Sequence, residues 1–138
     1  MINLIEKLQK AQIHAIKTRP KVGGFPYLAE VLRRAGVKQN IWSLPSCQSI
    51  YIMQEGQVIQ QGKPLIEGSE IIPHFSKENL IKAIRTDQEG KSTFPEFLMS
   101  AWLAGVTWYK VDFDNRTVTY GDAQNNIYVE NYPLVDIE

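Results

Sequence analysis

The sequence contains three cysteine and histidine side chains, which are common nucleophiles, bases and zinc ligands, and they lie far apart along the chain. Cys47 is the only cysteine, and His14 and His74 are the only histidines. A catalytic thiolate needs a neighbouring base, and a structural zinc site normally uses four Cys or His ligands. Neither histidine shares a motif with Cys47. We therefore expect a plain thiol, no catalytic residue, no bound metal, no cofactor and no intrachain disulfide.

Acidic residues in the last third of the chain are the second candidates for chemistry. Asp112, Asp114 and Asp122 carry the carboxylates that a divalent cation prefers. Asp114 falls at an expected turn and Asp122 in a loop, so we interpret both as turn residues. Asp112 and Arg116 flank the same turn, and we expect them to pair across it. The alternative is a small enzyme that uses Asp112, Arg116 and nearby tyrosines.

Aromatic residues gather in the segments that we expect to be strands. Their default role is to fill the core, but they could also line a pocket between the two halves of the chain. The residues concerned are Trp42, Tyr51, Trp108, Tyr109 and Tyr120. Together with Asp112 and Arg116, they are the candidate ligand-binding residues.

The composition is that of an ordinary globular protein. The 138 residues include 15 basic and 15 acidic side chains, and 43% are hydrophobic. Zero net charge, and no basic stripe interleaved with aromatic residues, argue against nucleic-acid binding. No stretch approaches the length of a membrane span, and no P-loop, GxSxG, HExxH or GxGxxG motif occurs. We expect a cytoplasmic protein without nucleic acid or membrane as partner.

Charge is unevenly distributed along the chain. Residues 1–38 contain eight basic and two acidic side chains, whereas residues 107–138 contain two basic and six acidic ones. We expect these segments to pair within the fold. The alternative is a contact between subunits, which would make the protein a homodimer.

Two stretches of the sequence are nearly the same. GFPYLAEVLRRAGV begins at Gly24 and TFPEFLMSAWLAGV begins at Thr93, an offset of 69 residues. The same offset relates Gly36 to Gly105, and it still holds between Tyr51 and Tyr120. We interpret this as an internal duplication. It predicts a single domain, 1–138, built of two repeats (about 1–69 and 70–138) related by an approximate two-fold axis.

Each repeat has the same predicted elements. Apolar residues at helical spacing, caps and alternating segments predict helix, helix, strand, strand, strand. The helices are expected at 3–18, 25–35, 77–86 and 94–104, and the strands at 38–44, 48–54, 57–61, 106–113, 116–121 and 126–130. The fold class is therefore α+β, with helices packed against an antiparallel sheet.

Local signals set the ends of these elements. Thr93 and Glu96 form a capping-box pattern, and glycines at 36 and 105 stand where a left-handed residue ends a helix. Hairpin turns are expected at Glu55-Gly56 and at Asp114-Asn115.

The stretch FPEFLMSAWLAGVTWYKVDFDNRTVTYGD, preceded by AIRTDQEG, resembles the second half of the YbcV-like family. These are small bacterial proteins often labelled "phage envelope protein". The resemblance rests on Gln88, Gly90, Phe94, Phe97, Ala104, Gly105, Val106, Tyr109, Val111, Asp112, Arg116 and Tyr120. It covers nearly the whole chain and implies a duplicated fold, no known catalytic residues and a phage or prophage association. The first repeat departs from it, with Asn40, Ser43 and Cys47 in place of Tyr109, Asp112 and Arg116.

One helix face changes its chemistry between the repeats. In the first repeat it carries Glu30, Arg33 and Arg34, which we expect to be solvated. The equivalent residues of the second repeat are all apolar: Met99, Trp102 and Leu103. We predict that this second face is buried, either in the core against the other repeat or in a subunit contact.

These patterns favour a binding module without catalysis, whose ligand is a protein partner or a small molecule held between the repeats. The alternatives are the small enzyme with its site around Asp112 and Arg116, and a phage-derived structural protein. Polar side chains converging in a deep pocket would favour the enzyme, and a flat apolar patch would favour a partner-binding module.

Overall fold

The computed structural model describes residues 3–68 and 71–137. In the order of the chain they form α1 (Leu4–Thr18), α2 (Gly24–Arg34), β1 (Val37–Ser43), β2 (Gln48–Met53), β3 (Gln57–Gln61), α3 (Lys77–Gln88), α4 (Phe94–Leu103), β4 (Trp108–Asp112), β5 (Thr117–Gly121) and β6 (Ile127–Asn131). The α+β class and the repeated helix-helix-strand pattern are confirmed. The observed bounds differ from the expected ones by no more than two residues at either end.

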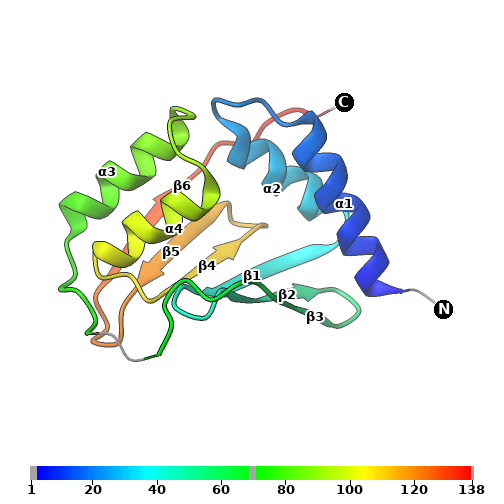
Figure 1. Ribbon diagram of the computed structural model, residues 1–138. Helices are drawn as coiled ribbons and strands as arrows, with labels where there is room; N and C mark the ends of the chain where they lie inside the picture. Colours follow the sequence, from blue (N-terminus) through cyan, green and yellow to red (C-terminus); the bar gives the residue numbers. More distant parts are fainter. Residues whose placement is uncertain (1–2, 69–70, 138) are drawn as a thin grey trace.

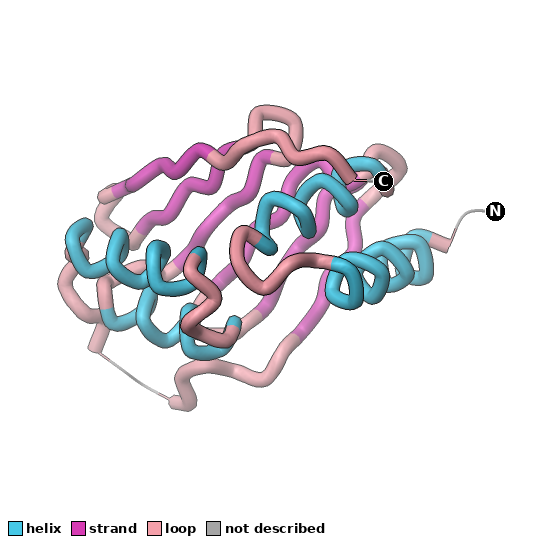
Figure 2. The backbone as a smooth tube through the Cα atoms, turned by 90° about the horizontal axis from the view of Figure 1, so that it is seen from above, coloured by secondary structure: helices cyan, strands magenta, loops and turns pink. Residues whose placement is uncertain are grey.

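The strands form one antiparallel sheet, and the helices lie over one of its faces (Figures 1 and 2). The strand order is β3-β2-β1-β4-β5-β6, so β1 and β4 pair at the centre and join the two repeats. The helix pair α1 and α2 belongs to one half of the sheet, and the pair α3 and α4 to the other. None of the described helices is long and apolar enough to cross a membrane.

The register of the central strands fixes the symmetry between the repeats. Ile41 of β1 pairs with Lys110 of β4, and these residues are related by the offset of 69. A residue that pairs with its own counterpart lies on the two-fold axis, so the axis passes between Ile41 and Lys110. The outer pairings follow the same offset. Tyr51 pairs with residue 40, and the residues 69 positions further on, Tyr120 and residue 109, also pair.

The turns repeat as well. Cys47 and Arg116 occupy equivalent hairpin positions, and both have a positive φ, 52° and 54°. Gly36 and Gly105 follow the equivalent helices with φ of 101° and 91°. At Gly105 a Cβ would lie 2.5 Å from the backbone of Phe75, so only glycine fits there.

The expected helix caps are present. The Thr93 side chain accepts from the backbone N–H of Glu96, and the Glu96 carboxylate accepts from that of Thr93. The side chains of Asn3 and Ser76 cap α1 and α3 by accepting from the backbone N–H groups of Glu6 and Asn79. The core lies between sheet and helices, and equivalent residues fill it in both repeats. Buried pairs include Val37 with Val106 and Leu44 with Phe113.

The apolar face of α4 is only partly buried. Trp102 is 5% exposed and belongs to the core, and Met99 packs at the edge of the core. Leu103 is 63% exposed, so it lies outside the core of this chain, and its burial in a subunit contact stays a prediction. Leu103 lies one helical position past Trp102, and 100° of rotation is enough to turn its side chain away from the sheet.

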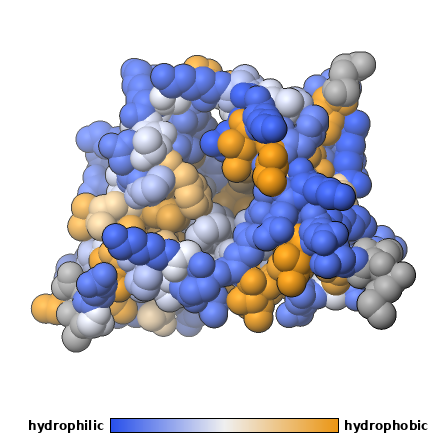
Figure 3. All heavy atoms as spheres, turned by 45° about the vertical axis from the view of Figure 1, so that its right-hand side comes forward, coloured by the Kyte–Doolittle hydropathy of each residue, from blue (hydrophilic) through white to orange (hydrophobic). Residues whose placement is uncertain are grey.

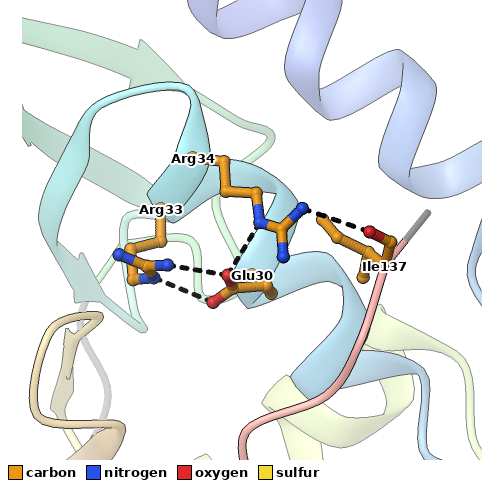
Figure 4. Close-up of polar contacts among 4 residues, drawn as sticks. All are labelled: Glu30, Arg33, Arg34 and Ile137. Atoms are coloured by element: carbon orange, nitrogen blue, oxygen red, sulfur yellow. Dashed lines mark hydrogen bonds and ion pairs between the residues drawn. The ribbon is translucent and has the colours of Figure 1, made fainter.

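The equivalent face of α2 is also not as expected, because Glu30 is only 4% exposed. Its carboxylate accepts two hydrogen bonds from Arg33, both of 2.8 Å, and one of 2.9 Å from Arg34 (Figure 4). Arg34 also donates to the backbone carbonyl of Ile137, which ties the C-terminal segment to α2. Two arginines thus satisfy a buried carboxylate, and the expectation that Glu30 is solvated is wrong.

The burial of Trp102 gives the first prediction. Trp102→Ala is expected to lower the free energy of unfolding by about 3–5 kcal/mol, because it removes a large core side chain. The neighbouring Leu103→Ala should cost less than about 1 kcal/mol, since its side chain is mostly in water. Urea denaturation of the two variants measures both values. Equal costs would contradict this assignment of core and surface.

The ion pairs of Glu30 give a prediction for acid. Hydrogen bonds from Arg33 lower the pKa of Glu30 from 4.5 to about 2, against the opposing effect of burial. The stabilisation is complete above pH 4.5 and is lost as the pH falls from 4.5 towards 2. It amounts to about 2 kcal/mol, allowing for solvent around the half-exposed arginines.

Glu30→Gln should therefore flatten the fall in stability across that acid window. Chemical denaturation at several pH values measures it, with exposed Glu67→Gln as the control. An unchanged pH dependence in Glu30→Gln would show that the carboxylate is not stabilised by the arginines.

Candidate functional site

A continuous row of side chains crosses the helix-covered face of the sheet. Alternation along each strand and the register between strands place one residue from each strand in this row. From β3 to β6 the row is Gln60, Ser49, Trp42, Tyr109, Tyr120 and Tyr128. Polar residues of the first repeat thus stand beside an aromatic series that runs into the second.

Aromatic contacts hold the centre of this row. Trp42 stacks on Tyr109 with ring centroids 5.9 Å apart, and Tyr109 lies 5.8 Å from Tyr120. Phe94, at the start of α4, packs edge-on against Trp42 at 5.2 Å. Burial raises the pKa of Tyr109 and Tyr120 well above the ordinary value, so both stay neutral phenols. Trp42 is therefore fixed in position by rings of the second repeat.

A pocket of about 410 Å³ lies beside Trp42 at the polar end of the row. Its lining residues are Trp42, Cys47, Ser49, Gln60, Gln61 and Gly62. All six belong to the first repeat. The expected ligand pocket was placed between the repeats, and this one borders the second repeat only through Trp42 and its contacts with Phe94 and Tyr109.

Ser49 is the unusual residue of the pocket. Its side chain is 1% exposed, and Oγ has no hydrogen-bond partner among the described residues. The Tyr51 hydroxyl lies close to it without hydrogen-bonding geometry. Burying a hydroxyl without a partner costs free energy, and such groups are rare in folded proteins. The Ser49 hydroxyl, buried at the wall of the pocket, therefore keeps an unused donor and acceptor.

Gln60, which lines the pocket, is held by an amide of α1. The Gln12 and Gln60 side chains exchange two hydrogen bonds, each 3.0 Å long. Each amide keeps a second N–H and a second lone pair. In the second repeat Glu130 pairs with Val118 as Gln60 pairs with Ser49, so it takes the place of Gln60 in the sheet. It too contacts a helix, through its ion pair with Arg85 of α3.

Cys47 lines the pocket as a buried thiol. It sits in the β1–β2 turn, and its Sγ donates to the backbone carbonyl of Leu44 at 3.6 Å. Burial raises the pKa of the thiol, so Cys47 is protonated at neutral pH. This agrees with the expectation of a plain thiol.

The second-repeat candidates lie outside this pocket. Trp108 is on the opposite face of the sheet, where its ring lies so close over Gly121 that a Cβ there would be 2.3 Å from it. Asp112 is on that face too, and its carboxylate accepts from the backbone and side chain of Asn115. Asp112 and Arg116 form no ion pair, so their expected pairing is wrong. Asp112 closes the turn itself, as an aspartate at the start of a turn commonly does.

The other two aspartates have turn roles, as expected. Asp114 pairs with Lys38 at 3.4 Å, one of the contacts expected between the basic and acidic segments. Asp122 accepts from the backbone N–H groups of Gln124 and Asn126. Across the part of the chain that the structure describes, no group of three or more His, Cys, Asp or Glu side chains could hold a metal ion.

Sequence reasoning missed Gln12, Ser49 and Gln60. The alternation in QSIYIM does place Ser49 on the same face as Tyr51 and Met53, so a polar residue at a core position was a visible signal. Gln12 could not be found this way, because its contact with Gln60 depends on how α1 crosses the sheet.

Comparison with known proteins places this architecture in a family. Residues 13–131 match the model described as "Protein of unknown function (DUF1398)". The chain belongs to the DUF1398 family. The match extends from α1 to the end of β6 and so includes both repeats.

Similar proteins are found in mycobacteria. The chain is 49% identical over 132 residues to the uncharacterized proteins Mb2035 of Mycobacterium bovis and Rv2012 of Mycobacterium tuberculosis. The aligned part covers 96% of this chain and 80% of each relative. At this identity the relatives share the DUF1398 fold.

The setting of Cys47 gives a third prediction. Native protein should react with iodoacetamide at least about tenfold more slowly than urea-unfolded protein, because the thiol is buried and protonated. Cys47→Ser should change the free energy of unfolding by less than about 1 kcal/mol, since a hydroxyl can also donate to Leu44. Mass spectrometry of timed alkylation measures the first effect. Fast native alkylation would mean that Cys47 is activated.

Proposed function

We propose that this protein is a binding module for a small, uncharged, polar molecule held beside Trp42. The volume of about 410 Å³ lies within the range of small-molecule sites. The lining combines one aromatic side chain with a hydroxyl, a thiol and two carboxamides. Such a set offers donors and acceptors but no obvious catalytic base or nucleophile.

The unpaired Ser49 hydroxyl is the observation that carries the proposal. Val118 occupies the equivalent position of the second repeat and is buried there. The fold thus accepts an apolar side chain at this place and does not require a hydroxyl. A hydroxyl kept in the core of the first repeat, without a partner and against a pocket, is best explained by a ligand that supplies the missing hydrogen bond.

The charge of the pocket supports an uncharged ligand. None of the six lining residues carries a charge, and the raised pKa values of Cys47 and Tyr51 keep both groups neutral at pH 7. A charged ligand would lose its hydration and find no counter-charge. A neutral molecule with amide or hydroxyl groups can bond to Ser49 and to the unused N–H groups and lone pairs of the Gln12–Gln60 amide pair.

The other functions considered from the sequence stay predictions. An enzyme would use Asp112 and Arg116, which lie apart from this pocket. The YbcV-like resemblance and the phage role that it implies rest on the sequence alone. The organisation as a single domain is likewise our proposal, supported by the continuous sheet through both repeats.

Matched probes test the proposal. Nicotinamide with nicotinate, and uracil with orotate, pair a neutral ring with an anionic one of similar shape. We expect saturation-transfer NMR signals from neutral members and weak ones from the anions. Ser49→Ala should reduce the neutral signals at least about tenfold, because the ligand loses its hydrogen bond to a buried hydroxyl.

The stability of the free protein supplies an independent readout. Ser49→Ala should leave the free energy of unfolding unchanged or raise it by about 1 kcal/mol, because an unsatisfied buried hydroxyl is removed. The control is Ser46→Ala. The Ser46 hydroxyl donates to the Ser43 hydroxyl, so its removal should lower the free energy of unfolding. Destabilisation by Ser49→Ala, or anions that bind as well as neutral rings, would contradict the proposal.

A further inference from the structure

The face of the sheet opposite the helices is open. None of the four described helices covers it (Figures 1 and 2). Its central row runs through all six strands as Ile59, Ile50, Ile41, Lys110, Thr119 and Val129. Isoleucine at three successive positions is unusual for a sheet face that meets only water.

The flanking rows of this open face are also largely free of charge. Ile52 and Trp108 add apolar surface next to the central row, and Ile127 adds more at the β6 edge, where it is 58% exposed. Lys110 and Asp112 are the two charged residues in the paired strand positions of this face. Neither has an ion-pair partner within the described part of the chain.

We propose that the open sheet face is the interface of a two-fold symmetric dimer of this chain. A second copy is favoured over another partner because the face is complementary to itself. Its apolar rows need an apolar surface of equal extent, and its two charges need one positive and one negative partner. A second copy supplies both charges and sets the isoleucine row against an uncharged row of the same extent.

The position of the two charges supports the symmetry. Lys110 and Asp112 lie two residues apart on β4, about 6.6 Å, and point to the same side. A two-fold axis in the plane of the interface that crosses β4 midway between them places each Lys110 against Asp112 of the second copy. The same rotation places Ile50 against Ile52 of the second copy, and it places Ile41 and Ile59 against the uncharged Gln39 and Gln57.

The size of the face fits a dimer that uses all of it. Six strands about 4.8 Å apart, each five residues long at about 3.3 Å per residue, span about 29 Å by 17 Å. Because side chains make this surface uneven and so enlarge its area, two copies would bury roughly 1,200 Å² in total. This is the lower end of the range for specific interfaces. A partner that covers only the isoleucine half would fall below that range.

A competing surface exists on α1. Ile13 and Ile16 are exposed on the outer side of this helix, and Figure 3 shows that apolar atoms on this side of the molecule form separate patches among polar ones. Lys10 and Lys17 flank these two isoleucines on the same helix. Two copies meeting here would bring like charges together over a small area.

The test begins with one matched pair of variants. Ile59 is 62% exposed on the open face and Ile16 is 61% exposed on α1, so neither change to lysine should disturb folding. Sedimentation velocity from micromolar to submillimolar concentration should find the unaltered protein and Ile16→Lys dimeric. Ile59→Lys should be a folded monomer. A monomeric parent protein, or a dimer that survives Ile59→Lys but not Ile16→Lys, would overturn the proposal.

A charge exchange tests the two-fold axis itself. Lys110→Glu makes both charges negative, and Asp112→Lys makes both positive, so each variant alone should dissociate at least about tenfold more readily. Mixing the two should restore the dimer as a heterodimer, which contacts within one chain cannot produce. Circular dichroism confirms that each variant is folded, and a mixture that stays monomeric would exclude this axis.

Discussion

The antiparallel pairing of β1 with β4 is the constraint on which the rest of this structure depends. Without it each repeat would be a three-stranded sheet with two helices and an exposed strand edge. The pairing of Ile41 with Lys110, which are counterparts, sets the two-fold axis and leaves no freedom in the register. It also brings Trp42 opposite Tyr109 on the helix side. The core, the aromatic row and the open face all follow from this one ladder.

Equal backbones with unequal side chains explain why the two repeats differ in chemistry. Hairpin turns, helix ends and strand registers match, including the positive φ at Cys47 and Arg116. At the floor of the pocket, however, Ser49 is replaced by Val118, and Gln60 by Glu130. The second repeat fills its space with an apolar side chain and an ion pair to Arg85. The first repeat keeps a cavity and a hydroxyl without a partner.

Much of this fold was accessible from the sequence because its signals are local. The offset of 69 residues, the capping box at Thr93 and the alternation in the strands predict the elements and their order. Which side chains are buried was harder to predict. Glu30 looked solvated from its neighbours on the helix, yet its two arginines lie i+3 and i+4 from it and satisfy it where it is buried. Leu103 looked buried by analogy with Trp102, and its position around the helix keeps it out of the core of this chain.

The pocket was the feature hardest to predict from the sequence, because it depends on contacts between segments far apart in sequence. Residues 59 and 60 show how closely the two proposed surfaces are joined. Gln60 faces the pocket and Ile59 faces the open side, since neighbours on a strand point in opposite directions. β3 is an edge strand with one partner strand, so it opens at lower cost than the central strands of the sheet. In the proposed dimer Ile59 would be covered, β3 would open less often, and Gln60 would be held more firmly against Gln12. The two surfaces of one strand would then be coupled through its stability, without any change in the shape of the sheet.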